Sequence, residues 1–339
     1  MRSAIVGAGS MGLVLGAYIS KAKEQIDLID INKEHVEELK KNGAIITGTV
    51  KMNVPVSAMT YDEITGKYDL IFLMTKQMLN KSIIESMLPY MNDDAVICTM
   101  QNGMPEPSVA EVIGDDRVVG CTIAWGATFV GPGVSELTSE AGPESLTFDI
   151  GTVTGKPNPK MNEIKRLLEL MGPTTIVDNF AGARWAKLLI NASFSGMSAV
   201  MGCTFGEAAA NKQSRLCVLR IIKECIDVTN ALGIKIEPIQ GQDVVKLIDY
   251  KDKITEMKSL FIIPIVIKKH NLLKASMLQD LEHGRKTEID AMNGAVSYYG
   301  KKSGVPTPYN DMVVEIVHSI ENGERTYSYD NLELFKTLK

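Results

Sequence analysis

Along the first half of the chain, short apolar runs alternate with segments whose apolar residues recur every three or four positions. The short runs predict buried strands of a parallel sheet, and the periodic segments predict helices. This alternation is typical of an α/β fold in which helices cover both faces of the sheet. The expected strands are Ser3–Val6, Ile26–Ile29, Lys67–Thr75, Ala95–Met100 and Arg117–Ile123.

After these strands the alternation of strand and helix patterns becomes less regular. Ser135–Thr152 resembles two antiparallel edge strands, Pro159–Met171 a helix, and Thr174–Val177 a last short strand. The composition shifts between Gly172 and Gly182, so we expect a first domain over residues 1–178 and a second over 179–339.

Strand patterns nearly vanish in the second domain, which is expected to be mainly helical. One apolar run, Leu260–Ile267, is predicted to lie at a subunit or domain contact, which favours a homodimer. The expected helices are Ala181–Val200, Glu207–Leu232, Ser276–Lys302 and Asn310–Asn322.

Composition narrows the classes of function. The 339 residues carry a formal charge of −5, which gives no reason to expect a nucleic acid or an anionic membrane as partner. The longest apolar run is too short to span a bilayer. The cysteines are odd in number and scattered in apolar surroundings, so we expect buried reduced thiols in a cytoplasmic protein. They are Cys98, Cys121, Cys203, Cys217 and Cys225.

A glycine-rich turn follows the first strand. The residues Gly7-Ala8-Gly9-Ser10-Met11-Gly12 fit the G-x-G-x-x-G pattern in its strand–turn–helix setting. Gly7 is expected to make the tight turn, Gly9 to let a diphosphate approach the backbone, and Gly12 to let helix and strand pack closely. Such a turn can also be merely a turn, but its setting favours a dinucleotide site.

Asp30 ends the second strand. A carboxylate there accepts hydrogen bonds from the adenosine ribose and repels a 2′-phosphate, so it favours NADH over NADPH. The alternative is that Asp30 caps the helix Asn32–Lys41, which Asn32 could do equally well. Lys33 could weaken the preference for NADH.

Two polar residues follow later strands. Lys76 and Asn102 stand at carboxyl ends of strands, on the edge where ligands of open parallel sheets bind. Each also has a plain interpretation, since lysine is common in solvated loops and Asn-Gly is common in turns.

The segment Ala183–Ser195 predicts a helix that presents Lys187 and Asn191 on one face, with Ser195 one step further along. A lysine facing inward needs an anion. Glu288, expected in the middle of the helix Ser276–Lys302, is a candidate partner, although most such glutamates are solvated. Ser276 begins a capping-box pattern.

With these residues, the chain resembles the ketopantoate reductases (2-dehydropantoate 2-reductases) from Met1 to about Asn322. The glycine motif is shared by many dehydrogenases, whereas the later landmarks are more specific. They are K-Q at Lys76, Q-N-G at Asn102, R-W-A-K-L-L-I-N at Lys187 and Asn191, S-M-L-Q-D at Ser276, and K-T-E-I-D at Glu288.

The resemblance implies a Rossmann-type domain followed by a helical domain of the 6-phosphogluconate dehydrogenase type. It implies NADPH-dependent reduction of a 2-keto acid to the 2-hydroxy acid in the pathway to pantothenate and coenzyme A. By similarity, Lys187 is the proton donor, and Asn191 and Ser276 bind substrate. Asn102 lies between cofactor and substrate, Glu288 lies beside the lysine and the ligands, and the main chain near Gly126 touches the nicotinamide.

The chain also departs from the family pattern. Ser195 stands where a substrate-contacting asparagine is expected, a further expected asparagine falls near Phe205, and Asp30 replaces a partner for the 2′-phosphate. These departures leave open a related reductase of a different 2-keto acid or of an imine. A non-catalytic dinucleotide sensor is a second alternative. The histidines are not spaced as metal ligands, so no metal is expected.

Overall fold

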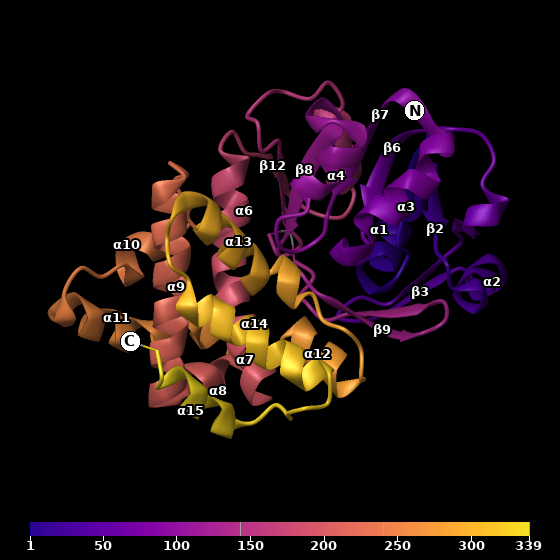
Figure 1. Ribbon diagram of the computed structural model, residues 1–339. Coiled ribbons are helices and arrows are strands. Elements are labelled where there is room, and N and C mark those ends of the chain that lie inside the picture. Colours follow the sequence, from indigo (N-terminus) through magenta and orange to yellow (C-terminus); the bar gives the residue numbers. More distant parts are fainter. Residues whose placement is uncertain (143, 240, 339) are drawn as a thin grey trace. The chain divides into compact units, whose positions relative to one another are not determined.

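The computed structural model describes residues 1–142, 144–239 and 241–338, and the chain divides into two compact units. Unit 1 contains residues 1–101 and 105–180, coloured indigo to magenta in Figure 1. Unit 2 contains residues 102–104 and the chain from residue 181 onward.

Unit 1 is built on a mixed sheet with the strand order β12-β11-β8-β7-β6-β1-β2-β5. β8 and β11 pair antiparallel, and the other neighbours pair parallel. The strand order reverses beside β1, because the chain adds β2 and β5 on one side and then β6, β7 and β8 on the other. The strands are β1 Ser3–Val6, β2 Ile26–Ile29, β5 Ser57–Met59, β6 Tyr68–Leu73, β7 Met91–Thr99, β8 Val118–Ile123, β11 Phe148–Gly151 and β12 Thr174–Ile176.

The predicted parallel strands are therefore present, with ends shifted by a few residues. β1 is buried along its whole length, as are β6 and β8 apart from Asp69, because helices cover both faces of the sheet. The helices of unit 1 are α1 Ser10–Lys21, α2 Lys33–Asn42, α3 Asn80–Met87, α4 Glu106–Ile113 and α5 Met161–Leu168.

A second sheet, with the order β4-β3-β10-β9, was not anticipated from the sequence. Ser135–Thr152, expected as two antiparallel edge strands, does hold two strands that each have one antiparallel neighbour, but they lie in different sheets and neither is an edge strand. β10 pairs parallel with β3 in the second sheet, whereas β11 joins the first sheet beside β8. The strands of the second sheet are β3 Ala44–Gly48, β4 Met52–Val54, β9 Ala127–Gly131 and β10 Val134–Leu137.

Unit 2 is helical, as predicted, and its apolar core includes Trp185, Phe194 and Ile222. The long helix α9 packs against both α13 and α14 (Figure 1). The helices are α6 Phe180–Ile190, a π-helix Asn191–Ser195, α7 Gly196–Met201, α8 Phe205–Ala210, α9 Lys212–Ala231, α10 Val244–Ile248, α11 Lys253–Val266, α12 Ser276–Glu282, α13 Asn293–Ser303, α14 Pro308–Glu321 and α15 Leu332–Phe335.

The expected single helix Ser276–Lys302 is wrong, since α12 and α13 are separate. Gly284 follows α12 with a φ of +64°, in the left-handed region that ends helices. The backbone N–H and the hydroxyl of Thr287 then both donate to Oε1 of Glu321 at 2.7 Å, which holds this segment out of a helix. Ser276 is the first residue of α12 and does not cap it, because Ala275 occupies the N-cap without a side-chain bond.

Two further observations bear on the class of protein. The five cysteines are buried free thiols, as expected. Among the described residues, no helix is long and apolar enough to cross a membrane, and no cluster of three or more metal-ligating side chains is found.

Candidate active site

The glycine-rich turn lies where the strand order reverses, between the carboxyl ends of β1 and β6. Gly7 has a φ of +95°, and its N–H donates to the carbonyl of Ile29 at 2.9 Å. A Cβ at Gly7 would lie 2.8 Å from the side chain of Thr75, and a Cβ at Gly12 would lie 2.2 Å from the carbonyl oxygen of Gly7. The expected roles of these two glycines, the tight turn and the close packing, are confirmed.

Gly9 differs from its neighbours because a Cβ there would meet no heavy atom within 4 Å. It is the N-cap of α1, and no side chain of the cap residue accepts from the first N–H groups of that helix. Backbone donors at a helix N-terminus next to an open glycine fit a diphosphate. Binding of a dinucleotide at this turn stays a prediction.

Asp30 stands at the carboxyl end of β2. Its Oδ1 accepts the backbone N–H of Asn32 at 3.0 Å, while Asn32 itself caps α2 by accepting the N–H of His35 at 3.1 Å. The alternative that Asp30 caps α2 is therefore wrong. Burial, together with the charge of Asp30, raises the pKa of the nearby Tyr61 to about 12.

Lys76 follows Thr75, which lies against Gly7, and its role toward a cofactor stays a prediction. The loop is fixed by Gln101, whose side-chain amide donates to the carbonyl of Thr75 at 2.7 Å and to Oδ1 of Asn80 at 2.6 Å. Gln101 is buried. This role of Gln101 was not predicted from the sequence, in which its position next to Asn102 is the only sign of it.

Asn102 groups with unit 2 although Gln101, the residue before it, belongs to unit 1. Gly126, expected near the nicotinamide, has its main chain engaged within unit 1. Its N–H donates to Oγ of Ser139 at 2.9 Å, and its carbonyl accepts the N–H of Thr138 at 3.0 Å. Its role toward a nicotinamide stays a prediction.

The segment expected to be one helix with Lys187 in it is helical but changes type. α6 ends at Ile190, and Asn191–Ser195 forms a π-helix before α7 begins. Lys187 and Asn191 are both half-buried and are four residues apart across this change. A π-turn holds one residue more than an α-helical turn and is frequent at functional sites.

A buried chain of polar side chains supports the π-helix. The side-chain amide of Asn293 donates to the carbonyl of Ala192 at 3.0 Å and to Oδ1 of Asn310 at 2.9 Å. The side-chain amide of Asn310 donates in turn to Oε2 of Glu224 at 2.7 Å. All three polar side chains are buried. The loss of one hydrogen bond would therefore leave a buried polar group of the neighbouring side chain without that partner.

Glu224 also closes the N-terminus of α14. Its carboxylate accepts the backbone N–H groups of Tyr309 at 2.8 Å and of Asn310 at 3.0 Å. Burial raises its pKa to about 7, although these donors act in the opposite direction. A glutamate between the apolar residues Ile222 and Cys225 and next to Lys223 was the sequence signal for this role, and it was missed.

Of the positions that depart from the family pattern, Ser195 and Phe205 are buried, whereas Asp30 is half-buried. Ser195 ends the π-helix, and Phe205 stacks on Phe194 with a centroid distance of 5.6 Å. Gly196 is required next to Ser195, because a Cβ there would lie 2.8 Å from Oδ1 of Asn293.

Two predicted site residues come from elements other than the helix of Lys187. Ser276 is exposed at the start of α12, and α12 packs against the π-helix. Glu288 lies in the non-helical segment just before a short 3-10 helix, Ile289–Ala291, and not in mid-helix as expected. Its pairing with Lys187 stays a prediction.

Comparisons with known proteins match most of the chain to one family. Residues 3–151 match the family model described as ketopantoate reductase PanE/ApbA, and residues 179–321 match the model of its C-terminal domain. The chain is 28% identical over 320 residues to a 2-dehydropantoate 2-reductase from Streptococcus pyogenes, covering 94% of this chain and 97% of that protein.

Solved structures share the fold. A D-mandelate dehydrogenase in a ternary structure with NADH and anilino(oxo)acetate superposes with a TM-score of 0.79 at 23% identity, covering 95% of this chain and 99% of that one. A dimeric ketopantoate reductase from Staphylococcus aureus has a TM-score of 0.73 at 18% identity, covering 96% of this chain and 100% of that one.

Proposed function

The chain belongs to the ketopantoate reductase family, an oxidoreductase family, and from this premise we propose that it reduces 2-dehydropantoate to pantoate. The observation that carries the proposal is that each of the two regions matched by the family models contains one of the two groups of predicted site residues. The region 3–151 contains the glycine-rich turn, and the region 179–321 contains Lys187 in α6 and Asn191 at the start of the π-helix.

The cofactor we propose is a reduced nicotinamide dinucleotide, which supplies a hydride to the carbonyl carbon of the keto acid. The residues Gly7 to Gly12 would hold its diphosphate, Asp30 its adenosine ribose, and Lys76 a further polar group beside the turn. Asp30 favours NADH, while the family resemblance favours NADPH.

Lys187 is the proposed proton donor. As an ammonium group it polarises the ketone and then gives one proton to the carbonyl oxygen, so that the keto acid gains a hydride and a proton in all. Glu288 is proposed to keep the lysine charged, since an opposite charge favours the ionised form. Asn102, Asn191, Ser195 and Ser276 are the proposed hydrogen-bonding groups for the carboxylate and hydroxyl of the substrate.

A second candidate is the reduction of a different 2-keto acid. Ser195 and the buried Phe205 replace amides expected for pantoate, which leaves fewer polar groups for its hydroxyl. The structurally similar D-mandelate dehydrogenase, bound to NADH and an oxoacetate, shows which ligands this fold accommodates elsewhere.

We also propose a homodimer, formed through the apolar face of α11. Ile254, Met257, Phe261 and Ile265 are 60% to 82% exposed on this helix, an arrangement unusual for a surface that faces only water. A dimeric relative supports the idea. The buried thiols favour the cytoplasm as its compartment.

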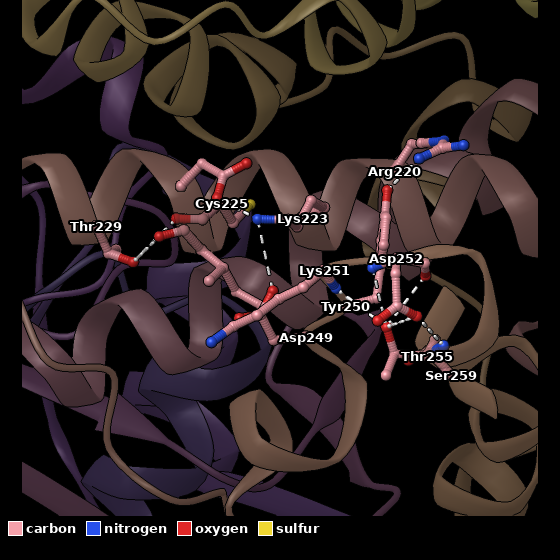
Figure 2. Close-up of polar contacts among 12 residues, drawn as sticks. Arg220, Lys223, Cys225, Thr229, Asp249, Tyr250, Lys251, Asp252, Thr255 and Ser259 are labelled. Atoms are coloured by element: carbon pink, nitrogen blue, oxygen red, sulfur yellow. Dashed lines mark hydrogen bonds and ion pairs between the residues drawn. The ribbon is translucent and has the colours of Figure 1, made fainter. Parts of the chain in front are cut away.

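α11 is firmly attached to the rest of unit 2. Figure 2 shows Arg220 reaching Tyr250 and Lys223 reaching Asp249, which join α9 to the segment before α11. The carboxylate of Asp252 then caps α11 by accepting the N–H of Thr255 at 2.8 Å. The exposed face thus belongs to an ordered helix, as a contact surface requires.

The proposal is tested by following the consumption of NADH and of NADPH with 2-dehydropantoate and with two or three other branched 2-keto acids. The highest kcat/KM with 2-dehydropantoate supports the proposal, and a higher value with another keto acid supports the second candidate. Dinucleotide binding without oxidation by any keto acid would instead indicate a sensor.

A further inference from the structure

Two buried side chains hold the carbonyl groups on either side of Gly9. Nε2 of His35 lies 2.8 Å from the carbonyl oxygen of Ala8, and the hydroxyl of Ser135 donates to the carbonyl of Ser10 at 2.8 Å. His35 is 1% exposed and Ser135 is fully buried. Side chains of α2 and of the second sheet therefore reach the backbone of the glycine-rich turn.

The hydrogen bonds of His35 fix its proton. The backbone N–H of Gly133 donates to Nδ1 at 2.9 Å, so Nδ1 carries no proton. Nε2 must then carry it and donate to Ala8. The ring also packs against Phe129, at a centroid distance of 5.3 Å. His35 is thus a neutral tether between the glycine-rich turn and the turn between β9 and β10.

These tethers set the direction of backbone donors. A trans peptide unit is planar, so the carbonyl of one residue points away from the N–H of the next. Holding the carbonyls of Ala8 and Ser10 toward His35 and Ser135 therefore turns the N–H groups of Gly9 and Met11 to the opposite side. The turn itself has room at Gly9, since a Cβ there would meet nothing within 4 Å.

We propose that His35 and Ser135 are positioning residues that aim the N–H groups of Gly9 and Met11 at the diphosphate of the dinucleotide. The inference rests on the cofactor part of the proposed function and is independent of the identity of the keto acid. Neither residue belongs to the G-x-G-x-x-G pattern, and both act through main-chain carbonyls that any residue could supply.

The test is the dissociation constant of NADH, NADPH and ADP-ribose, measured by titration calorimetry on the full chain. His35→Phe keeps an aromatic ring and removes both hydrogen bonds, and Ser135→Ala removes one hydroxyl. We expect each variant to bind all three ligands about tenfold or more weakly, the equivalent of one good hydrogen bond. His35→Gln, which restores a donor, should recover part of the affinity.

Asn158→Leu is the matched control in the same unit. Asn158 is buried and donates to the carbonyl of Asp116 at 2.8 Å, at the opposite, amino-terminal end of β8. Its loss should lower the melting temperature without changing the three dissociation constants. At saturating NADH, the KM for the keto acid should stay unchanged in His35→Phe.

Three results would overturn the inference. The first is unchanged binding in a folded His35→Phe or, should that variant not fold, in Ser135→Ala. The second is a variant that binds AMP, which lacks a diphosphate, more weakly by the same factor as it binds ADP-ribose. The third is a wild-type chain that binds no dinucleotide. A chain that binds dinucleotides normally but reduces no keto acid refutes the proposed function and leaves this inference standing.

Discussion

The side-chain amide of Asn293 donates a buried hydrogen bond to the main-chain carbonyl of Ala192, inside the π-helix that follows Lys187. The bond joins α13 to the segment that contains Asn191 and Ser195. Because Asn310 and Glu224 extend the chain of bonds, the π-helix is supported by polar groups that are themselves buried.

Replacing Asn293 with leucine should therefore lower kcat/KM for the keto acid while leaving the dissociation constant of NADH unchanged. The lost donors should also cost about 1–3 kcal/mol of stability. Asn331→Leu is the control, because Asn331 donates a similar buried bond to the carbonyl of Val200 in α7. Equal losses of kcat/KM in both variants would show that Asn293 has only a general structural effect.

Glu224 should make stability depend on pH. Its pKa is raised by burial from 4.5 to about 7 in the folded chain, so the folded state binds the proton more tightly than the unfolded state. Stability from this group is therefore complete below pH 4.5 and is lost as pH rises through 7, by about 3 kcal/mol in all. Urea unfolding between pH 5 and 8 measures this slope.

Glu224→Gln should flatten the slope, since glutamine does not titrate. Glu207→Gln serves as control: the pKa of Glu207 is lowered by its hydrogen bonds to Thr204, so this group stays ionised throughout that pH range. A slope unchanged by Glu224→Gln would mean that Glu224 is already ionised at pH 5.

Lys187→Ala should lower kcat by about 10²–10⁴, the usual contribution of a general acid. Dinucleotide affinity should not change, because the glycine-rich turn lies in unit 1. Lys301→Ala, at an exposed position of α13, is the control and should behave like the parent. A kcat within a few-fold of the parent would remove Lys187 from the role of proton donor.

The homodimer can be tested at Phe261, which is 71% exposed on α11. Phe261→Glu should convert a dimer into a monomer in light-scattering chromatography, because a charge would be buried in an apolar contact. Ile31→Glu, at an 83% exposed apolar residue of unit 1, should remain dimeric. A monomeric parent, or a dimeric Phe261→Glu, contradicts the proposed contact.

Much of unit 1 could be predicted because its strands are runs of apolar residues, and the residues that end them, such as the glycines after β1, are recognisable in the sequence. Gly7 needs its positive φ and Gly12 its lack of a Cβ for reasons that lie within the motif itself. The second sheet could not be predicted, because β3 and β10 pair across some ninety residues of chain. No local pattern encodes a pairing of that range.

In unit 2 the sequence indicated which segments are helical but not where helices change or stop. The π-helix at Asn191 and the break before Glu288 depend on distant partners, Asn293 in one case and Glu321 in the other. The spacing of apolar residues is helical on both sides of such a change, so the spacing does not reveal where the change occurs. The residues that hold the site were therefore harder to find than the residues proposed to do the chemistry.

Asp30 provides the sharpest test of the cofactor. Its carboxylate ends β2, where it would accept hydrogen bonds from the ribose and repel a 2′-phosphate. Asp30→Ser should therefore raise kcat/KM for NADPH relative to that for NADH, and the ratio of the two is the quantity to measure. Glu34→Gln removes an equal charge from the first turn of α2 and should leave the ratio nearly unchanged. If both variants shift the ratio alike, the effect is one of net charge; if neither does, Asp30 does not select the cofactor.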